Sequence, residues 1–385
     1  MKILLTHRYF WPDTAPYALM LRAIGEGLAD AGHEICVFAS KPSYREGQTA
    51  AVSREKLGRL AVRRCWVLRE NRKNPALRVA NVFLYCAALF VHILRLRPDA
   101  VTASTFPPVI AAWTASFAAG LIGAKFIYHI QDIHPEVSQY SGGFLGRRLP
   151  ARFLRWLDNQ TLRRADTIVT LSQDMQETLQ ARGLGPLPLK IINNLPLDAF
   201  EEASAPPAEL RKAPGTSRVI FAGNLGRFQN LPLLAEGIAQ CFSSHPDLEL
   251  FFLGDGAALP DLKARWGAHP QVRFAPFLPF SEARALIKEA DIGLVSLAPN
   301  IYRVAYPSKV STYRDLNLRV LALVEPDSRL ALDLVQSGQG AVPNTQTPDA
   351  IQNALERVID MAVPKADPKA NQSAKHAAWA EIFAS

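Results

Sequence analysis

Short runs of apolar or β-branched residues alternate along most of the chain with longer segments of helical periodicity. The short runs predict strands at residues 2–6, 34–39, 100–103, 125–130 and 167–171, and again at 218–222, 249–253, 272–274, 292–296 and 320–324. Helices are predicted between most of them, among others at 231–242, 259–266, 281–289 and 308–316. This alternation is typical of parallel sheets covered by helices on both faces, and therefore predicts an α/β fold.

A polar, proline-rich segment at 193–217 interrupts the alternation and predicts an interdomain linker. The chain has 385 residues, enough for two domains. We therefore expect two doubly wound, Rossmann-like domains, at 1–192 and 218–363, which face each other across a cleft. In the tail, 364–385, Trp379 and Phe383 lie four residues apart on one helical face, so this tail is expected to pack back on the first domain.

Charge is distributed unevenly. The sequence carries 43 Lys and Arg against 35 Asp and Glu, a formal net charge of +8. Through Lys190 the count is 25 against 14, a net of +11, whereas from Ile191 onward it is 18 against 21, a net of −3. Nucleic acid, an anionic membrane or a phosphorylated substrate would each explain the basic half. The sequence contains no recognisable DNA- or RNA-binding module, which disfavours nucleic acid.

Hydrophobic residues make up 49% of the chain, so disordered and fibrous classes are excluded. The four cysteines form no pair or cluster, which excludes a disulfide framework and a zinc site and favours the reducing cytosol. The first apolar run is too short for a signal peptide. Residues 76–94 are apolar but interrupted by Arg78, Asn81 and His92, so we expect no membrane span.

Basic residues surround apolar ones in two parts of the first half. One part is the apolar helix predicted at 79–94, and the other lies between residues 144 and 164. A helix lying in the headgroup plane of an anionic membrane has this composition; the alternative is a buried helix whose neighbouring arginines are solvated. The basic residues are Arg72, Lys73, Arg78, Arg95 and Arg97 around the first part and Arg147, Arg148, Arg152, Arg155, Arg163 and Arg164 in the second, interleaved with Phe144, Leu145, Phe153, Leu154 and Trp156.

Ligands bind beyond the carboxyl ends of strands in open α/β sheets, so the loops there are examined for chemistry. The loop after the first strand has no glycine, which excludes a dinucleotide fingerprint and a Walker loop. Its aromatic residues Tyr9, Phe10 and Trp11 either line an acceptor site or pack under the first helix. After strand 125–130, Asp132 and His134 stand two residues apart on a loop that suits acid–base chemistry, although a plain polar turn has similar residues.

The second predicted domain opens with a strand that runs into Gly223-Asn224-Leu225-Gly226-Arg227 before a helix. Glycines there let an anion such as a diphosphate approach backbone N–H groups at the helix start. Gly254-Asp255-Gly256 repeats the arrangement after the next strand. Lys309 lies in the first turn of a predicted helix, against the usual dipole preference, so it either serves an anion or is an ordinary solvated lysine.

Together these segments resemble the retaining glycosyltransferases of family 4, which have the GT-B fold, and most closely the bacterial branch for colanic acid and O-antigen, including N-acetylfucosamine transferases. The resemblance covers nearly the whole chain. Its most specific pieces are Gln131-Asp132-Ile133-His134-Pro135-Glu136, Ala222-Gly223-Asn224-Leu225-Gly226, Gly254-Asp255-Gly256 and Tyr306-Pro307-Ser308-Lys309-Val310.

The resemblance implies a nucleotide-sugar donor in the second domain and an acceptor in the first, with no cofactor and no metal. Asp132 and His134, with Lys309 and Arg227, would be catalytic. The donor-binding residues would be Gly223, Asn224, Gly226, Gly254, Asp255, Phe274, Pro307, Ser308 and Thr312. The acceptor-binding residues would be Tyr9, Phe10, Trp11 and Thr14.

The chain departs from the family pattern at three places. The usual pair of glutamates eight residues apart is matched by Val304 and Thr312. The usual arginine and lysine after the glycine are matched by Asn224 and either Gln229 or Asn230, which leaves Arg227 and Lys309 as the nearest cations. The histidine of the common His-Asp pair is Gln131.

The activity implied is transfer, with retention, of an N-acetylhexosamine or deoxy-N-acetylhexosamine from a UDP-linked donor. The acceptor would be lipid-linked or an oligosaccharide of a bacterial surface polysaccharide, and the enzyme would be cytoplasmic and peripherally bound to the inner membrane. No Asp-x-Asp triplet follows a strand, so metal independence is expected. A nucleotide-sugar 2-epimerase of the same architecture and a basic nucleic-acid-binding protein are the alternatives.

Overall fold

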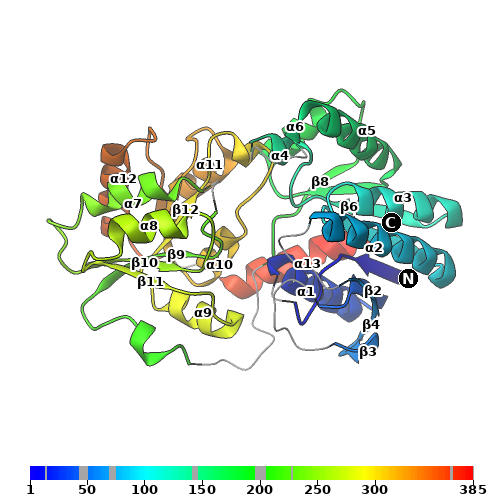
Figure 1. The fold of residues 1–385 in the computed structure, drawn as a ribbon, viewed down its shortest axis with the longest axis horizontal. Coiled ribbons are helices and arrows are strands. Elements are labelled where there is room, and N and C mark those ends of the chain that lie inside the picture. Colours follow the sequence, from blue (N-terminus) through cyan, green and yellow to red (C-terminus); the bar gives the residue numbers. More distant parts are fainter. Residues whose placement is uncertain are drawn as a thin grey trace. The chain divides into compact units, whose positions relative to one another are not determined.

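The computed structural model describes residues 1–13, 15–42, 51–68, 75–140, 146–195, 205–226, 229–364 and 367–384. The chain divides into two compact units (Figure 1). Unit 1 comprises Met1–Leu197, Val304–Tyr306 and Asn371–Ser385, and unit 2 comprises Asp198–Arg303 and Pro307–Ala370. The expected domain limits were 1–192 and 218–363, so most of the predicted linker belongs to unit 2 and the end of the tail to unit 1.

In the part of the chain that the structure describes, unit 1 is built on an eight-stranded sheet of order β3-β4-β2-β1-β5-β6-β7-β8. All neighbours are parallel except β3 and β4, which are antiparallel. The strands are β1 (Lys2–Thr6), β2 (Glu34–Ser40), β3 (Arg54–Leu57), β4 (Leu60–Cys65), β5 (Ala100–Ser104), β6 (Lys125–His129), β7 (Thr167–Thr170) and β8 (Leu189–Ile191). The helices are α1 (Pro16–Asp30), α2 (Pro75–Leu96), α3 (Ile110–Ile122), α4 (Glu136–Tyr140), α5 (Arg148–Arg164), α6 (Gln173–Gln180) and α13 (Pro368–Ala384).

Unit 2 holds a six-stranded sheet among its described residues, of order β11-β10-β9-β12-β13-β14 and parallel throughout. The strands are β9 (Ser217–Ala222), β10 (Leu248–Leu253), β11 (Val272–Ala275), β12 (Ile292–Ser296), β13 (Arg319–Leu323) and β14 (Gly340–Ala341). The helices are α7 (Leu231–Ala239), α8 (Leu259–Trp266), α9 (Phe280–Lys288), α10 (Lys309–Asp315), α11 (Arg329–Gln336) and α12 (Pro348–Asp360), with 3₁₀ turns at Ala208–Leu210 and Ile301–Arg303.

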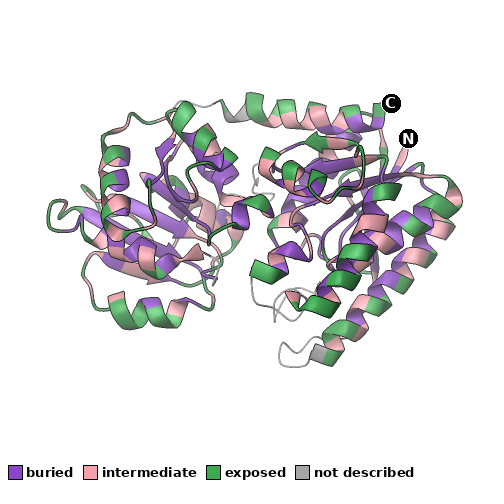
Figure 2. Ribbon diagram, turned by 90° about the horizontal axis from the view of Figure 1, so that it is seen from above, coloured by how far each residue is buried: buried purple, intermediate pink, exposed green. Residues whose placement is uncertain are grey.

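Each sheet forms the centre of its unit, with buried strands between helices that expose their outer faces (Figure 2). The central strands β1, β5, β10 and β12 are apolar runs buried on both sides, as parallel strands under two helical layers must be. The sequence pattern missed β3, β4, β8 and β14. Strand β4 alternates, and one of its inward side chains is Arg64, which donates to Glu55 of β3, so its apolar signal is broken.

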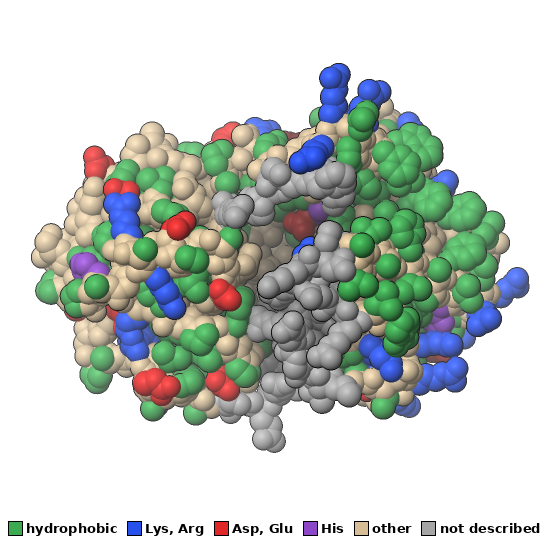
Figure 3. Space-filling model, viewed as in Figure 1, with side chains coloured by type: hydrophobic (Ala, Val, Ile, Leu, Met, Phe, Trp, Pro, Cys, Tyr) green, Lys and Arg blue, Asp and Glu red, His purple; other side chains and the backbone are tan. Residues whose placement is uncertain are grey.

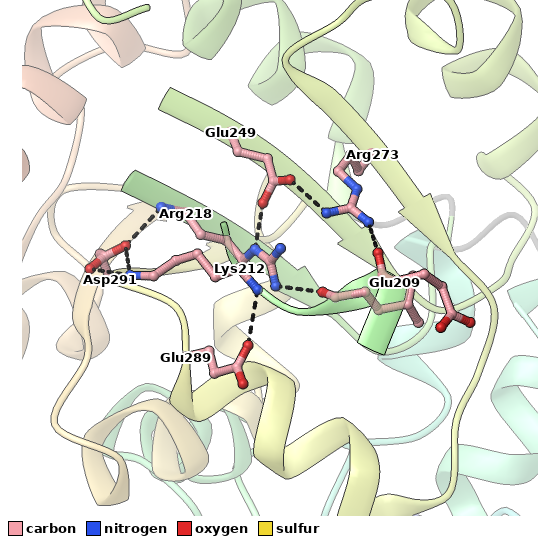
Figure 4. Close-up of polar contacts among 8 residues, drawn as sticks. Glu209, Lys212, Arg218, Glu249, Arg273, Glu289 and Asp291 are labelled. Atoms are coloured by element: carbon pink, nitrogen blue, oxygen red, sulfur yellow. Dashed lines mark hydrogen bonds and ion pairs between the residues drawn. The ribbon is translucent and has the colours of Figure 1, made fainter. Parts of the chain in front are cut away.

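Residues 205–217 of the predicted linker are attached to unit 2 by a network of charged groups (Figure 4). The buried Arg218 donates through Nη1 to Leu210 O at 2.9 Å and pairs with Glu249. Lys212 Nζ lies 2.8 Å from Asp291, and Arg273 donates to Glu249 and to the backbone oxygen of Glu209. These contacts hold the segment against the amino ends of β9 to β12, so it has no linker character here.

Helix α2 differs from its sequence prediction. An 18-residue window within its residues Ala76–Leu96 has a mean hydropathy of 1.8, and the helix meets the length and composition of a membrane span, because Asn81 and His92 are uncharged. In the structure one face, with Tyr85, Leu89 and Ile93, is buried in the core of unit 1. The opposite face, including Phe83, is exposed. Helix α2 is therefore buried on one face and exposed on the other.

Helix α13 ends against unit 1. Trp379, Ile382 and Phe383 are buried, and Lys375 Nζ donates to Asn194 O at 2.7 Å. A Cβ at Gly27 of α1 would lie 2.0 Å from the imidazole of His376, so the two helices approach as closely as a glycine permits. Residues of this helix contribute directly to the surroundings of the site in unit 1.

Candidate functional site

Two glycine loops lie side by side at the carboxyl ends of β9 and β10. Gly223 N donates to Leu253 O, and Leu225 N donates to Asp255 O, each at 2.8 Å. Gly254 has a φ of +143°, and a Cβ there would lie 1.9 Å from Gly223 O, so the loops fit together only with glycine at this position. The strand ends therefore carry backbone without side chains, which leaves room for a ligand at the edge of the sheet.

The N–H groups of these glycines already donate to acceptors within unit 2. Gly254 N donates to Ala275 O at 2.9 Å, Gly256 N to Asp255 Oδ1 at 2.7 Å and Gly226 N to Gln229 Oε1 at 2.6 Å. The sequence prediction that glycine amides bind an anion is thus not met by these groups as they stand. The glycines provide close approach, and positive charge has to come from a side chain.

Lys309, the first residue of α10, brings an amine to the glycine loops. Its Nζ is buried, lies 3.3 Å from the centroid of the Phe221 ring, and is 4.0 Å from where a Cβ on Gly223 would stand. Among the described residues, Nζ has no hydrogen-bond partner. Burial lowers the pKa of Lys309 to about 7, whereas the ring face of Phe221 favours the protonated form. The buried position of this amine contradicts the alternative interpretation, in which Lys309 is an ordinary solvated lysine.

The other donor-binding candidates lie around this centre in unit 2. Asn224 and Asp255 are exposed on the two loops, Gly226 is buried, and Phe274 stacks on Phe252 with ring centroids 5.3 Å apart. Pro307 and Ser308 precede α10 and are partly exposed, and Thr312 is buried within the helix. Arg227 lies outside the described residues. Gln229 was missed as a contact, although it accepts from both Gly226 N and Ser296 Oγ.

In unit 1 the loop after β6 is held on both sides. Asp132 forms an antiparallel bridge with Ala305, and Ile133 N donates to Val304 O at 2.7 Å. Asp132 N lies 3.4 Å from Thr105 Oγ1, at the end of the neighbouring strand β5. Asp132 as a residue is partly exposed, whereas its carboxyl is buried, and this burial raises the pKa of the carboxyl to about 6. This carboxyl is ionised at neutral pH and can accept a proton or hydrogen bond from a ligand hydroxyl.

His134 is tied into a buried ionic network that sequence reasoning missed. Arg182 donates to His134 O at 2.9 Å and pairs with Glu136 at 2.8 Å and Asp158 at 2.6 Å. Tyr128 Oη also donates to Asp158. Burial lowers the pKa of His134 to about 4, so its ring is neutral at physiological pH. The network fixes the backbone of the loop, since a buried arginine leaves little freedom to its partners.

Aromatic rings gather where β1, β5 and β6 end. Phe106 is exposed and stacks on Tyr9 with ring centroids 5.1 Å apart, and the rings of His7 and Tyr17 have centroids 4.6 Å apart. Of the predicted acceptor residues, Phe10 is fully buried, so its side chain fits the packing alternative and cannot line an open site. Tyr9 is mostly buried, Trp11 is partly exposed, and Thr14 lies outside the described residues.

Sequence comparison relates the first unit to a known family. Residues 17–194 match the family model described as a glycosyl transferase 4-like domain. WbjE of Pseudomonas aeruginosa, named as a glycosyltransferase, is 23% identical over 284 residues, covering 72% of this chain and 70% of the relative. WcaI of Escherichia coli K12, named as a colanic acid biosynthesis glycosyl transferase, is 24% identical over 333 residues, covering 81% and 80%.

Solved structures share the fold of the whole chain. Sucrose-phosphate synthase from Thermosynechococcus elongatus has a TM-score of 0.68 at 13% identity and covers 99% of this chain and 94% of its own. HepE of Anabaena, solved with UDP and glucose, has a TM-score of 0.64 at 17% sequence identity, and the match covers 100% of this chain and 98% of HepE. A structure described as a UDP-N-acetylglucosamine 2-epimerase from Listeria monocytogenes has a TM-score of 0.58 at 12% sequence identity, and the match covers 100% of this chain and 97% of the epimerase. The fold alone therefore does not separate glycosyl transfer from epimerisation. The comparisons thus show that residues 17–194 match a glycosyl transferase 4-like domain and that the chain as a whole has the GT-B fold of these solved structures.

Proposed function

We propose that this protein is a glycosyltransferase of family 4 that moves an N-acetylhexosamine or deoxy-N-acetylhexosamine, with retention, from a UDP-linked donor to a lipid-linked or oligosaccharide acceptor of a bacterial surface polysaccharide. The observation that supports it best is the buried Nζ of Lys309 beside the side-chain-free loop at Gly223. An amine in that position suits a diphosphate. The name of the relative WcaI and the UDP in the HepE structure support the substrate classes.

In this proposal unit 2 stabilises the charge that develops on the departing nucleoside diphosphate. Lys309 supplies the cation, and the glycines at 223 and 254 let the phosphates come close. Retention would follow from attack on the same face as the leaving group, whose phosphate oxygen takes the acceptor proton. Asp132 would orient the acceptor hydroxyl through its ionised carboxyl, so a pair of carboxylates of the glycosidase type is not needed.

The experiment that tests the proposal is a transfer assay with a panel of UDP- and GDP-sugars and a polyprenyl diphosphate N-acetylglucosamine acceptor. We expect a new glycosidic product with one UDP-sugar, with the anomeric configuration of the donor preserved by NMR. A reaction with donor alone is the control. Conversion of the donor into its C2 epimer in that control, without transfer, would identify the 2-epimerase alternative and reject the proposal.

We expect the transfer to be independent of divalent metal, because the proposed charge stabilisation comes from Lys309. Treatment with EDTA followed by gel filtration should leave the rate within about twofold of the untreated enzyme. The measurement is the initial rate with and without added Mg²⁺ or Mn²⁺. A rate that EDTA abolishes and a divalent ion restores would contradict this expectation.

We also propose that unit 1 binds peripherally to the cytoplasmic face of an anionic membrane. Helix α3 packs against both α2 and α5, and apolar side chains are exposed on all three, with lysines and arginines at the edge of the patch (Figure 3). Exposed apolar area of this extent with a basic rim suits anionic headgroups. Leu154 of the sequence prediction is buried and does not contribute, and residues 72, 73, 144 and 145 lie outside the described residues. The exposed apolar residues are Val79, Phe83, Leu84, Val91, Phe117, Leu121, Leu149, Phe153 and Trp156.

Liposome flotation tests the membrane proposal. The double variant Phe153→Ser, Trp156→Ser should bind anionic vesicles at least about tenfold more weakly than the wild type, because each large apolar side chain contributes about 1.5–3 kcal/mol when buried. Val335→Ser, at an exposed apolar position of α11 in unit 2, is the matched control and should bind normally. Equal recovery of the wild type with neutral and anionic vesicles, or in the unbound fraction with both, would reject the proposal.

A further inference from the structure

The imidazole of His129 lies at the end of β6, directly before the loop that carries Asp132, and both of its nitrogens are engaged. Its Nδ1 lies 2.9 Å from Tyr17 Oη and its Nε2 lies 2.8 Å from Gln131 Nε2. Burial lowers the pKa of His129 to about 3, so the ring is neutral and carries a single N–H. Gln131 therefore donates to Nε2, and Nδ1 donates to Tyr17.

This arrangement fixes the amide of Gln131. One of its two N–H groups is committed to His129, and this contact sets the direction in which Oε1 can accept a hydrogen bond from a ligand. Gln131 is partly exposed, and it is adjacent to Asp132. Tyr17 is in turn hydrogen-bonded to Ser104 at the end of β5, so the chain of contacts runs across three neighbouring elements of unit 1.

Helix α13 supports the imidazole from its other side. The indole of Trp379 packs edge-on against His129, with ring centroids 4.8 Å apart and an interplanar angle of 66°. Trp379 is buried, and the helix is held nearby by the Lys375 contact and by the ring of Phe383 against His33. A residue 250 positions later in the chain thus limits where the His129 ring can lie.

We propose that His129 is a positioning residue, clamped between Tyr17 and Trp379, that orients the Gln131 amide to accept a hydrogen bond from a hydroxyl of the acceptor sugar. The inference rests on the proposed transfer to a sugar acceptor and adds the residues that set acceptor affinity. Loss of the clamp lets Gln131 rotate without removing any group of the donor site. The cost is therefore expected in the KM for acceptor and not in the KM for donor.

The test is a double-mutant cycle on the full chain with polyprenyl diphosphate N-acetylglucosamine as acceptor. We expect Trp379→Ala and Gln131→Met each to lower kcat/KM for the acceptor by about tenfold, within the ~10²-fold that a misplacement of 1 Å can cost. Trp379→Phe keeps a ring at the contact and should stay within about twofold of the wild type. Because both changes act through one amide, Trp379→Ala should cause no further loss in the Gln131→Met background.

Phe383→Ala is the matched control, since it removes a second buried aromatic ring from the same helix without touching His129. It should lower the Tm of unit 1 as Trp379→Ala does, yet leave the acceptor KM unchanged and combine additively with Gln131→Met. An equal acceptor effect of Phe383→Ala, or additivity of Trp379→Ala with Gln131→Met, would show a purely structural role and overturn the inference. The cycle is measured on an enzyme that transfers sugar; a wild type that transfers none would refute the proposed function instead.

Discussion

The variant Lys309→Ala is expected to lower kcat for sugar transfer by about 10²-fold or more, the loss seen when one preorganised group that stabilises developing charge is removed. The reason is local to unit 2. The N–H groups of Gly223, Gly226 and Gly254 are already hydrogen-bonded within unit 2, so in the described part of the site Lys309 Nζ supplies the positive charge for the diphosphate. Steady-state kinetics with the UDP-sugar identified by the panel measure the effect, and Lys263→Ala at the end of α8 is the control.

Replacing Lys309 should lower the transfer rate without lowering the free energy of unfolding. Lys309→Met keeps the length of the side chain but removes a buried amine that has no hydrogen-bond partner among the described residues. The free energy of unfolding should stay the same or increase, because a buried polar group without a partner is unfavourable. Kinetics like the wild type in both variants would reject a role for this amine, and a lower Tm would attribute the loss of activity to the fold.

The pH dependence of donor binding follows from the same group. Because burial lowers the pKa of Lys309 from 10.5 to about 7, its amine is protonated below that pH and neutral above it in the free enzyme. A diphosphate favours the protonated form, so above about pH 7 binding must take up a proton, and KM for the donor should rise by up to about tenfold per pH unit. Lys309→Arg keeps its charge throughout this range and should remove the dependence.

The strands were predictable where both faces are buried. Strands β1, β5, β9, β10 and β12 are mostly apolar, although β9 carries Arg218 and β10 carries Glu249, and each of these five lies within one residue of its predicted limits. The edge strand β3 (Arg54–Leu57) is mostly charged, as exposed edges often are, and β4 carries an inward arginine. Neither resembles a buried parallel strand, and so hydrophobic pattern could not identify them.

The residues of the candidate site also fall into those that the sequence predicted and those that it missed. Asp132, Gly223 and Gly254 were found because they directly follow buried strands, where an open α/β sheet binds its ligands. Lys309 was found through a charge that its helix position does not explain. Tyr17, His129 and Trp379 meet only through tertiary structure, and a buried polar residue has the same appearance in a sequence as a solvated one. Arg182 was missed for this reason as well.

The variant Asp132→Asn is expected to lower kcat/KM for the acceptor by about 10²-fold, the cost of misplacing a reacting hydroxyl by 1 Å, because the ionised carboxyl that orients this hydroxyl is lost. The carboxyl belongs to a loop that the Arg182 network and the bridge to Ala305 hold in place. Asparagine keeps its shape but replaces an anionic acceptor by an amide. Asp30→Asn, which removes an exposed carboxylate paired with Arg59 in the same unit, should have no effect.

The pH profile distinguishes Asp132 from His134, which stands two residues later on the same loop. Burial raises the pKa of Asp132 to about 6 and lowers that of His134 to about 4. If ionised Asp132 is required, kcat/KM for the acceptor at saturating donor should rise about tenfold per pH unit up to pH 6 and then level off. This limb should vanish in Asp132→Asn and persist in His134→Gln. If the rate instead changes near pH 4, and only His134→Gln removes that change, the imidazole of His134 is the required group. The pH at which kcat/KM changes reports the pKa of the group that the reaction needs.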